Sequence, residues 1–357
     1  MNTARNMPPE SPETSPALSH DEALRVLRND LNQQGYYAPP TLLMGLQLGA
    51  HLVLIGLGLA GIAALPLVWA PLALLVLVGG TLGVATTVHT ASHQAFFKSS
   101  KLNSALAYWA YTVLLGMGSR YWYHRHIRVH HTNPNTDSVD LDVEQAPFFI
   151  LSERQLAEAS PMARRWQKLQ WYVWPLLVAG NGPSVKTDGL LWTMRAWFND
   201  KKRRKKYAAD LVGFVMHYAL WFGLPSLFFP FWQVLLFNVA YTVAIGYAIF
   251  ITFVPAHWPA EAETFAPGLK MDFSERQIRT AVNFRTGAIG HFFISGLHFQ
   301  VEHHLFPGMA HVYYPRVAEQ VQAFCEERGL PYRVFGWSEA LWKAVRVLKK
   351  PKPVVGA

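Results

Sequence analysis

The chain has 357 residues, 51% of them apolar, and carries a formal net charge of +9 at neutral pH. Its single cysteine, Cys325, excludes a disulfide framework and a metal site built from several thiolates. No nucleic-acid-binding motif accompanies the positive charge, so nucleic acid is not an expected partner.

The first 40 residues predict a tail followed by one short helix. The segment 1–16 is polar and rich in proline, and it lacks the apolar stretch of a cleavable signal peptide. Ser19 and Glu22 have the spacing of a capping box, and Gly35 stands where the end of a helix is expected. We therefore expect a short helix between Ser19 and Gly35.

Two long blocks without any Asp, Glu, Lys or Arg predict four membrane spans. The blocks are residues 36–97 and 211–260, and each is long enough for two helices of about 20 residues. Prolines interrupt the blocks near their middle, at Pro66 and Pro225, where a turn would join the two spans. The predicted spans are residues 42–65, 70–89, 211–229 and 232–254.

Lysine and arginine predict the orientation of these spans. The two predicted turns carry neither residue, whereas the segment 98–206 carries many and ends in KKRRKK at 201–206. By the positive-inside rule, this segment and both termini are cytoplasmic. We predict an all-α integral membrane protein, with a four-helix transmembrane bundle and a cytoplasmic helical cap, and we expect it in a bacterial inner membrane. The predicted divisions are a tail and short helix (1–40), a membrane domain (41–315) and C-terminal amphipathic helices (316–357).

The segment GLGLAG at 56–61 matches the Gly-x-Gly-x-x-Gly pattern of dinucleotide-binding sites. A dinucleotide site needs a preceding strand and a surrounding βαβ unit, and this segment lies inside a predicted span instead. Its glycines are expected to allow close packing between helices.

Histidines form three clusters. HTASH places two histidines four residues apart at the end of the second span, HIRVHH holds three more, and QVEHH holds two after Gln300. Residues four apart share one face of a helix. One further histidine follows the fourth span, so the predicted topology brings all of these side chains to the cytoplasmic mouth of the bundle. They are His89, His93, His126, His130, His131, His257, His303 and His304.

Eight imidazoles are too many for one metal ion but sufficient for two. Imidazole suits iron, copper, zinc and nickel, while zinc needs fewer ligands and performs no redox chemistry. A pair of irons is therefore the favoured interpretation. Five other residues are candidates for a place beside the metal ligands, namely Gln300, His298, His124, Asp137 and Asp140. For the two aspartates, a solvated acidic loop is the alternative.

The three clusters resemble the histidine boxes of membrane fatty acid desaturases. The forms are His-x-x-x-His, His-x-x-x-His-His and Gln-x-x-His-His, and the glutamine of the third is similar to the front-end group of that family. The resemblance implies two non-haem irons held by the eight histidines, with Gln300 near the metal. It also implies that O₂ and two electrons are used to introduce a double bond into an acyl chain.

The resemblance further implies a lipid or acyl-thioester substrate. Many front-end relatives carry a fused haem domain with a His-Pro-Gly-Gly motif, which this sequence lacks. A separate electron donor of the ferredoxin or cytochrome type is therefore expected, and basic residues such as those at 201–206 offer it a docking surface.

Two alternatives stay open at this point. A related di-iron hydroxylase or ketolase acting on a carotenoid, sterol, sphingolipid or alkane would carry the same boxes. A membrane transporter or metal carrier would use the histidines as a path. A translocation path places polar groups near the middle of the membrane, whereas these clusters adjoin one face.

Overall fold

The computed structural model describes residues 18–145 and 147–356, so the predicted tail at 1–17 lies outside the described residues. The first helix, α1 (His20–Gln33), begins after Ser19, whose side chain and that of Glu22 form the predicted capping box. Gly35 follows the helix with φ of +86°, a left-handed conformation that glycine adopts readily. The prediction of a short capped helix is confirmed.

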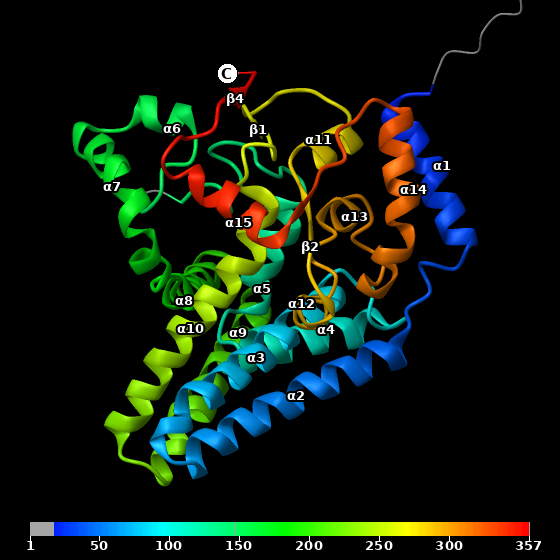
Figure 1. The fold of residues 1–357 in the computed structure, drawn as a ribbon. Coiled ribbons are helices and arrows are strands. Elements are labelled where there is room, and N and C mark those ends of the chain that lie inside the picture. Colours follow the sequence, from blue (N-terminus) through cyan, green and yellow to red (C-terminus); the bar gives the residue numbers. More distant parts are fainter. Residues whose placement is uncertain (1–17, 146, 357) are drawn as a thin grey trace, which may run out of the picture.

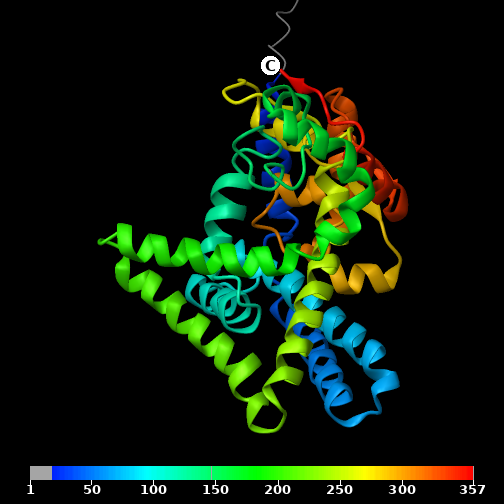
Figure 2. The same ribbon diagram turned by 90° about the vertical axis from the view of Figure 1, so that its left-hand side faces the viewer.

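Four helices are long and apolar enough to span a membrane, as predicted. They are α2 (Thr41–Ala64), α3 (Ala70–Ser92, preceded by the 3₁₀ turn η1, Leu67–Trp69), α9 (Arg204–Tyr218, continued by η4, Ala219–Gly223, and η5, Pro225–Leu227) and α10 (Phe231–His257). Large apolar side chains such as Leu42 and Leu67 are 78% and 87% exposed, which suits a surface that faces lipid. Both hairpin turns lie at the same end of the molecule (Figures 1 and 2).

The predicted span boundaries were wrong by a few residues. The third helix begins at Arg204 rather than 211, because the basic residues before the apolar segment continue the same helix. The second and fourth helices extend to Ser92 and His257, three residues beyond the predicted ends. The extension of α10 matters, because it places His257 in the last turn of a membrane helix, as His89 is in α3.

The hairpin of α2 and α3 is closely packed at the glycines of the GLGLAG segment. A Cβ atom on Gly58 would lie 2.6 Å from Leu77, and one on Gly61 would lie 2.9 Å from Ala73. A larger residue at either position would push the two helices apart. The packing interpretation of this segment is therefore confirmed for these two glycines.

The segment between the two hairpins folds into a series of shorter helices. Among them, α8 (Asn181–Asn199) crosses α10 where Gly182 meets Thr242 and Gly246, and its Gly189 meets Met117 in the loop that follows η2 (Trp109–Leu114). Figure 2 shows α8 running crosswise above the second hairpin. The elements are α4 (Ser100–Tyr108), η2 (a π-helix, Trp109–Leu114), α5 (Ser119–Trp122), η3 (a π-helix, Tyr123–His130), α6 (Glu153–Glu158), α7 (Pro161–Val178) and α8 (Asn181–Asn199).

The remaining elements except α12 form a cap at the end of the spans opposite the hairpin turns (Figure 1). Helix α12 packs beside α2 and α3, where Phe292 contacts His51 and Phe293 lies against Gly79. The core of the cap contains Leu31 of α1, Val301 and Leu305 of α13, and Val317 and Val321 of α14, all fully buried. The remaining elements are β1 (Thr264–Phe265), α11 (Phe273–Arg279), β2 (Asn283–Arg285), α12 (Ala288–Ile294), α13 (Gln300–Leu305), η6 (His311–Tyr313), α14 (Tyr314–Glu327), β3 (Val334–Gly336), α15 (Trp337–Arg346) and β4 (Val354–Val355).

Two parallel strand pairs fasten the late segments of the chain to this cap. Strand β4 pairs with β1, with Thr264 opposite Val354, and β3 pairs with β2, with Asn283 opposite Val334. The β1–β4 pair lies close to the end of α10, because β1 follows α10 after a short loop.

Candidate metal centre

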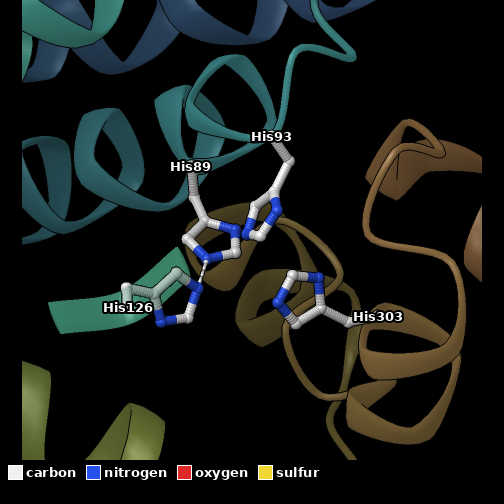
Figure 3. Close-up of side chains that lie close together, drawn as sticks. All are labelled: His89, His93, His126 and His303. Carbon is white, nitrogen blue, oxygen red and sulfur yellow. Dashed lines mark hydrogen bonds between the residues drawn. The ribbon is translucent and has the colours of Figure 1, made fainter. Parts of the chain in front are cut away.

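The eight histidines converge where the membrane helices meet the cap. One nitrogen from each of His89, His93, His126 and His303 lies within 4.8 Å of the others, and we call these four the four-histidine group (Figure 3). The corresponding nitrogens of His130, His257 and His304 also lie within 4.8 Å of one another and form the three-histidine group. His131 lies between the groups, with its ring 4.7 Å from the rings of both His303 and His304.

Four separate elements supply these side chains. The last turn and the C-cap of α3 carry His89 and His93, the last turn of α10 carries His257, and α13 carries His303 and His304. The middle cluster lies on a π-helix, η3, and not on the α-helix that we expected. Its backbone hydrogen bonds reach five residues along the chain, as from His131 N to His126 O. This wider turn lets consecutive histidines face different groups, and π-helical turns are frequent at functional sites.

Hydrogen bonds fix the orientation of every ring in the three-histidine group. The Nδ1 atom of His130 lies 2.9 Å from Asp140 Oδ2, that of His257 lies 3.0 Å from the carbonyl oxygen of Thr280, and that of His304 lies 2.7 Å from Gln277 Oε1. All three partners are acceptors, so each Nδ1 carries the proton and donates. Each Nε2 is then left with a lone pair.

These lone pairs point at one another. His304 Nε2 lies 3.3 Å from the Nε2 atoms of both His130 and His257. Three acceptors at this distance repel each other unless a cation lies between them. The three-histidine group is therefore suited to a metal ion, and its acceptors are of the type that commonly orients metal-binding histidines.

In the four-histidine group, ring nitrogens also face one another, but fewer hydrogen bonds hold the rings in place. The Nε2 atoms of His89 and His126 are 2.6 Å apart, and those of His93 and His303 are buried without a hydrogen-bond partner among the described residues. His303 Nδ1 donates to the Tyr314 hydroxyl at 3.3 Å, because that hydroxyl itself donates to a carbonyl. Buried acceptor nitrogens without donors are the second observation that fits a metal.

Burial favours the neutral form of these imidazoles, with His130 as the exception. It lowers the pKa of His126, His131, His303 and His304 well below the ordinary value of 6.5, and the neighbouring histidines lower it further. Neutral rings retain the lone pair that a metal needs. For His130, burial acts in the same direction, but the Asp140 carboxylate outweighs it and raises the pKa of that ring.

The five further candidates lie in different surroundings. Asp140 contacts His130 directly, and Gln300 is 3% exposed, with an Oε1 atom that has no described partner. The others make no described hydrogen bond or ring contact with the eight histidines. His124 faces α8 and stacks on Trp192, His298 pairs with His291, and Asp137 binds Ser152 and Arg154. For these three, the structure does not support a place beside the metal ligands.

Sequence reasoning missed the groups that orient His257 and His304. Gln277 and Thr280 come from α11 and the residue after it, and Asn135 donates to the carbonyl groups of His257 and Thr280. Lys352, only 3% exposed, also donates to the His257 carbonyl group. No local pattern signals these roles, because they depend on which elements pack against α10 and α13.

A cavity of about 460 Å³ adjoins the histidines. Four of the eight, His89, His126, His130 and His257, line it together with Gln300. Most of its wall is apolar, with side chains such as Leu82, Ile249 and Phe253, and the polar groups are few. The volume and the lining are typical of a site for a small apolar ligand.

Comparison with known proteins gives one consistent result. The family model for fatty acid desaturase matches residues 66–336. Fatty acid desaturase 3 of Bos taurus is 29% identical over 92% of this chain and 72% of its own length. The Delta(8)-fatty-acid desaturase of Euglena gracilis is 28% identical over 69% of this chain and 59% of its length, and the sn-1 linoleoyl-lipid 6-desaturase of Synechocystis sp. is 27% identical over 72% and 76%. Against the first four relatives, the matched part is between 55% and 72% of their length.

Proposed function

Since this chain belongs to the fatty acid desaturase family, we propose that it introduces a carbon–carbon double bond into the acyl chain of a membrane lipid or acyl thioester. It is an oxidoreductase, and its four apolar helices suit an integral membrane protein. The reaction removes two hydrogens from adjacent methylenes. O₂ accepts these together with two electrons and two protons from outside, and it leaves as two waters.

The observation that carries the proposal is the convergence of buried imidazole lone pairs. Two irons would be held by the four-histidine group and the three-histidine group, and His131, whose ring lies near both groups, would supply the eighth imidazole. When bound, the irons would supply the O₂-derived oxidant that an unactivated methylene requires and that side chains alone cannot provide. Asp140 would place a negative charge behind His130 and help to balance the charge of the site.

The protein's own contribution is to position the substrate and to exclude water. The apolar wall of the cavity holds an extended acyl chain beside His89, His126, His130 and His257. A chain held in one register presents the same pair of carbons in each turnover. The apolar wall also keeps bulk water away from the reacting carbons.

A separate electron donor of the ferredoxin or cytochrome type completes the proposed reaction. The basic segment 201–206 is largely exposed at the start of α9 and offers a surface for an acidic partner. The same segment favours a cytoplasmic position for the cap and for the histidines.

The alternative of a hydroxylase or ketolase is not favoured, because the relatives found are named as desaturases. A transport path is not favoured either, since the histidines gather where the last turns of α3 and α10 end, at one end of the spans.

The test is to produce the full chain in an aerated bacterial host together with a ferredoxin and its reductase. Acyl chains are then analysed by mass spectrometry with localisation of double bonds. The wild type is expected to form a new double bond and to contain about two irons, as the ligand count of the site requires. His304→Ala is expected to form none. His124→Ala, which removes a histidine outside both groups, is the matched control and is expected to behave as wild type. A new hydroxyl group would support the alternative, and a wild type that binds no iron would contradict the proposal.

A further inference from the structure

Lys186 is a positively charged residue in the wall of the apolar cavity. It lies on α8 on the same face as Gly182, Gly189 and Thr193, all of which are buried. Residues spaced three and four apart share a helix face, so the side chain of Lys186 turns inward. Its ammonium lies 5.6 Å from the centre of the Tyr241 ring and 3.4 Å from His217 Nε2.

The neighbours of Lys186 do not balance its charge. His217 donates through Nδ1 to the carbonyl oxygen of Val113, so its Nε2 accepts only one of the three ammonium hydrogens. No carboxylate in the described part of the chain forms an ion pair with Lys186. By contrast, Arg125, the other cation on the cavity wall, forms an ion pair with Asp142 at 2.9 Å.

The charged form of Lys186 is stabilised when an anion binds next to its ammonium group. Burial lowers the pKa of Lys186 to about 8, so the group keeps its proton at neutral pH. A buried charge without a partner is costly, and a bound anion would remove that cost through charge-assisted hydrogen bonds. The remaining donor capacity of Lys186 faces the same cavity that adjoins the histidines.

We propose that Lys186 binds an anionic group of the substrate, the phosphate of a lipid headgroup or of the carrier of an acyl thioester, and thereby fixes the register of the acyl chain in the cavity. This inference rests on the proposed function, because it assigns the cavity to an acyl substrate. The chain then extends from Lys186 towards the histidines. The position of the double bond is therefore counted from the anionic end, independently of the length of the chain.

The first test measures binding to the purified, metal-loaded full chain with three probes. Distearoylphosphatidylglycerol offers the phosphate of a lipid headgroup, stearoyl-coenzyme A offers the phosphates of a thioester carrier, and methyl stearate is neutral. The wild type is expected to bind at least one anionic probe about tenfold more tightly than methyl stearate, the size of one charge-assisted hydrogen bond. Whichever anionic probe is preferred identifies the source of the anion.

Variants of Lys186 distinguish the effect of its positive charge on binding from any effect on folding. Lys186→Met and Lys186→Gln are expected to lose the preference for the anion without weaker binding of methyl stearate, whereas Lys186→Arg is expected to keep part of it. Arg195→Met removes a positive charge from an exposed position on the same helix and is expected to bind as wild type. An anion preference that persists in both neutral variants, or that is absent from the wild type, overturns the proposal.

The second test measures the product. With 16- and 18-carbon chains, the wild type is expected to place the double bond at the same number of carbons from the anionic end, and Lys186→Met to give a mixture of positions. Binding is measured without turnover. A wild type that forms no double bond but shows the Lys186-dependent preference would contradict the desaturase function and leave the anion site intact.

Discussion

The two histidine groups differ in what holds their rings in place. In the three-histidine group, Asp140, Thr280 and Gln277 each accept a hydrogen bond of 3.0 Å or less from a ring nitrogen. In the four-histidine group, His303 has one long bond to Tyr314, and His126 is held by stacking on Trp122, with ring centres 4.5 Å apart. The first group is oriented by the protein before any metal binds. The second depends more on the metal itself to fix its rings.

The largest expected effect comes from removing neighbouring ligands of the two groups. His303→Ala and His304→Ala change adjacent residues of the same short helix, yet each empties a different group. Both variants are expected to form no double bond. His303→Ala is expected to keep about one iron, because the preorganised group remains complete, and His304→Ala is expected to keep less. Metal analysis of the purified variants measures this, and equal iron contents would remove the distinction between the groups.

Loss of an orienting acceptor is expected to have the next largest effect. Gln277→Leu removes the partner of His304 Nδ1 and leaves the ring free to turn. Iron affinity is expected to fall by about 10- to 100-fold, the usual range for such partners. Titration of the metal-free protein with Fe²⁺ measures it. Gln322→Leu, an exposed glutamine of α14, serves as the control and should leave the affinity unchanged.

The hydrogen bonds that Lys352 donates beside His257 are expected to have a smaller effect, on the stability of the fold. Lys352 Nζ donates to the carbonyl oxygens of His257 and Ala262, but both also accept from Asn135. Lys352→Met is therefore expected to lower the free energy of unfolding by about 1 kcal/mol, the net value of a typical hydrogen bond. Chemical denaturation in detergent measures this loss. A Lys352→Met variant as stable as wild type would show that Asn135 suffices.

The smallest effect is expected in the less anchored group. Tyr314→Phe removes only the 3.3 Å contact with His303 Nδ1. Because a bond of this length is weak, iron affinity is expected to change by less than about threefold. An Fe²⁺ titration alongside Gln277→Leu makes the comparison direct. A loss as large as that of Gln277→Leu would mean that both groups are anchored alike.

The membrane spans and the eight candidate histidines could be predicted from the sequence because their sequence signals are local. Long uncharged blocks predict membrane helices without knowledge of their neighbours, and the spacing of His89 and His93 is a property of one helix. The predicted convergence of the clusters followed from topology alone, since all of them fall on the same predicted side of the membrane.

The groups that orient the histidine rings could not be predicted from the sequence, for a physical reason. Gln277 reaches His304 only because α11 packs beside α13, and nothing in the segment FSERQIR indicates that contact. The π-helical turn at His126–His130 was also missed, because the same spacing fits an α-helix. His298 lies close to the third cluster in sequence, but it follows the left-handed turn at Ser295 and Gly296 and pairs with His291.

The parallel pairing of β4 with β1 joins a late segment of the chain to an earlier one. Lys352 and the β4 strand are translated after all eight histidines, yet Lys352 donates a hydrogen bond to the backbone carbonyl of His257. A nascent chain stalled before Lys352 would therefore carry all eight histidines but lack the hydrogen bonds that Lys352 donates to the carbonyl groups of His257 and Ala262.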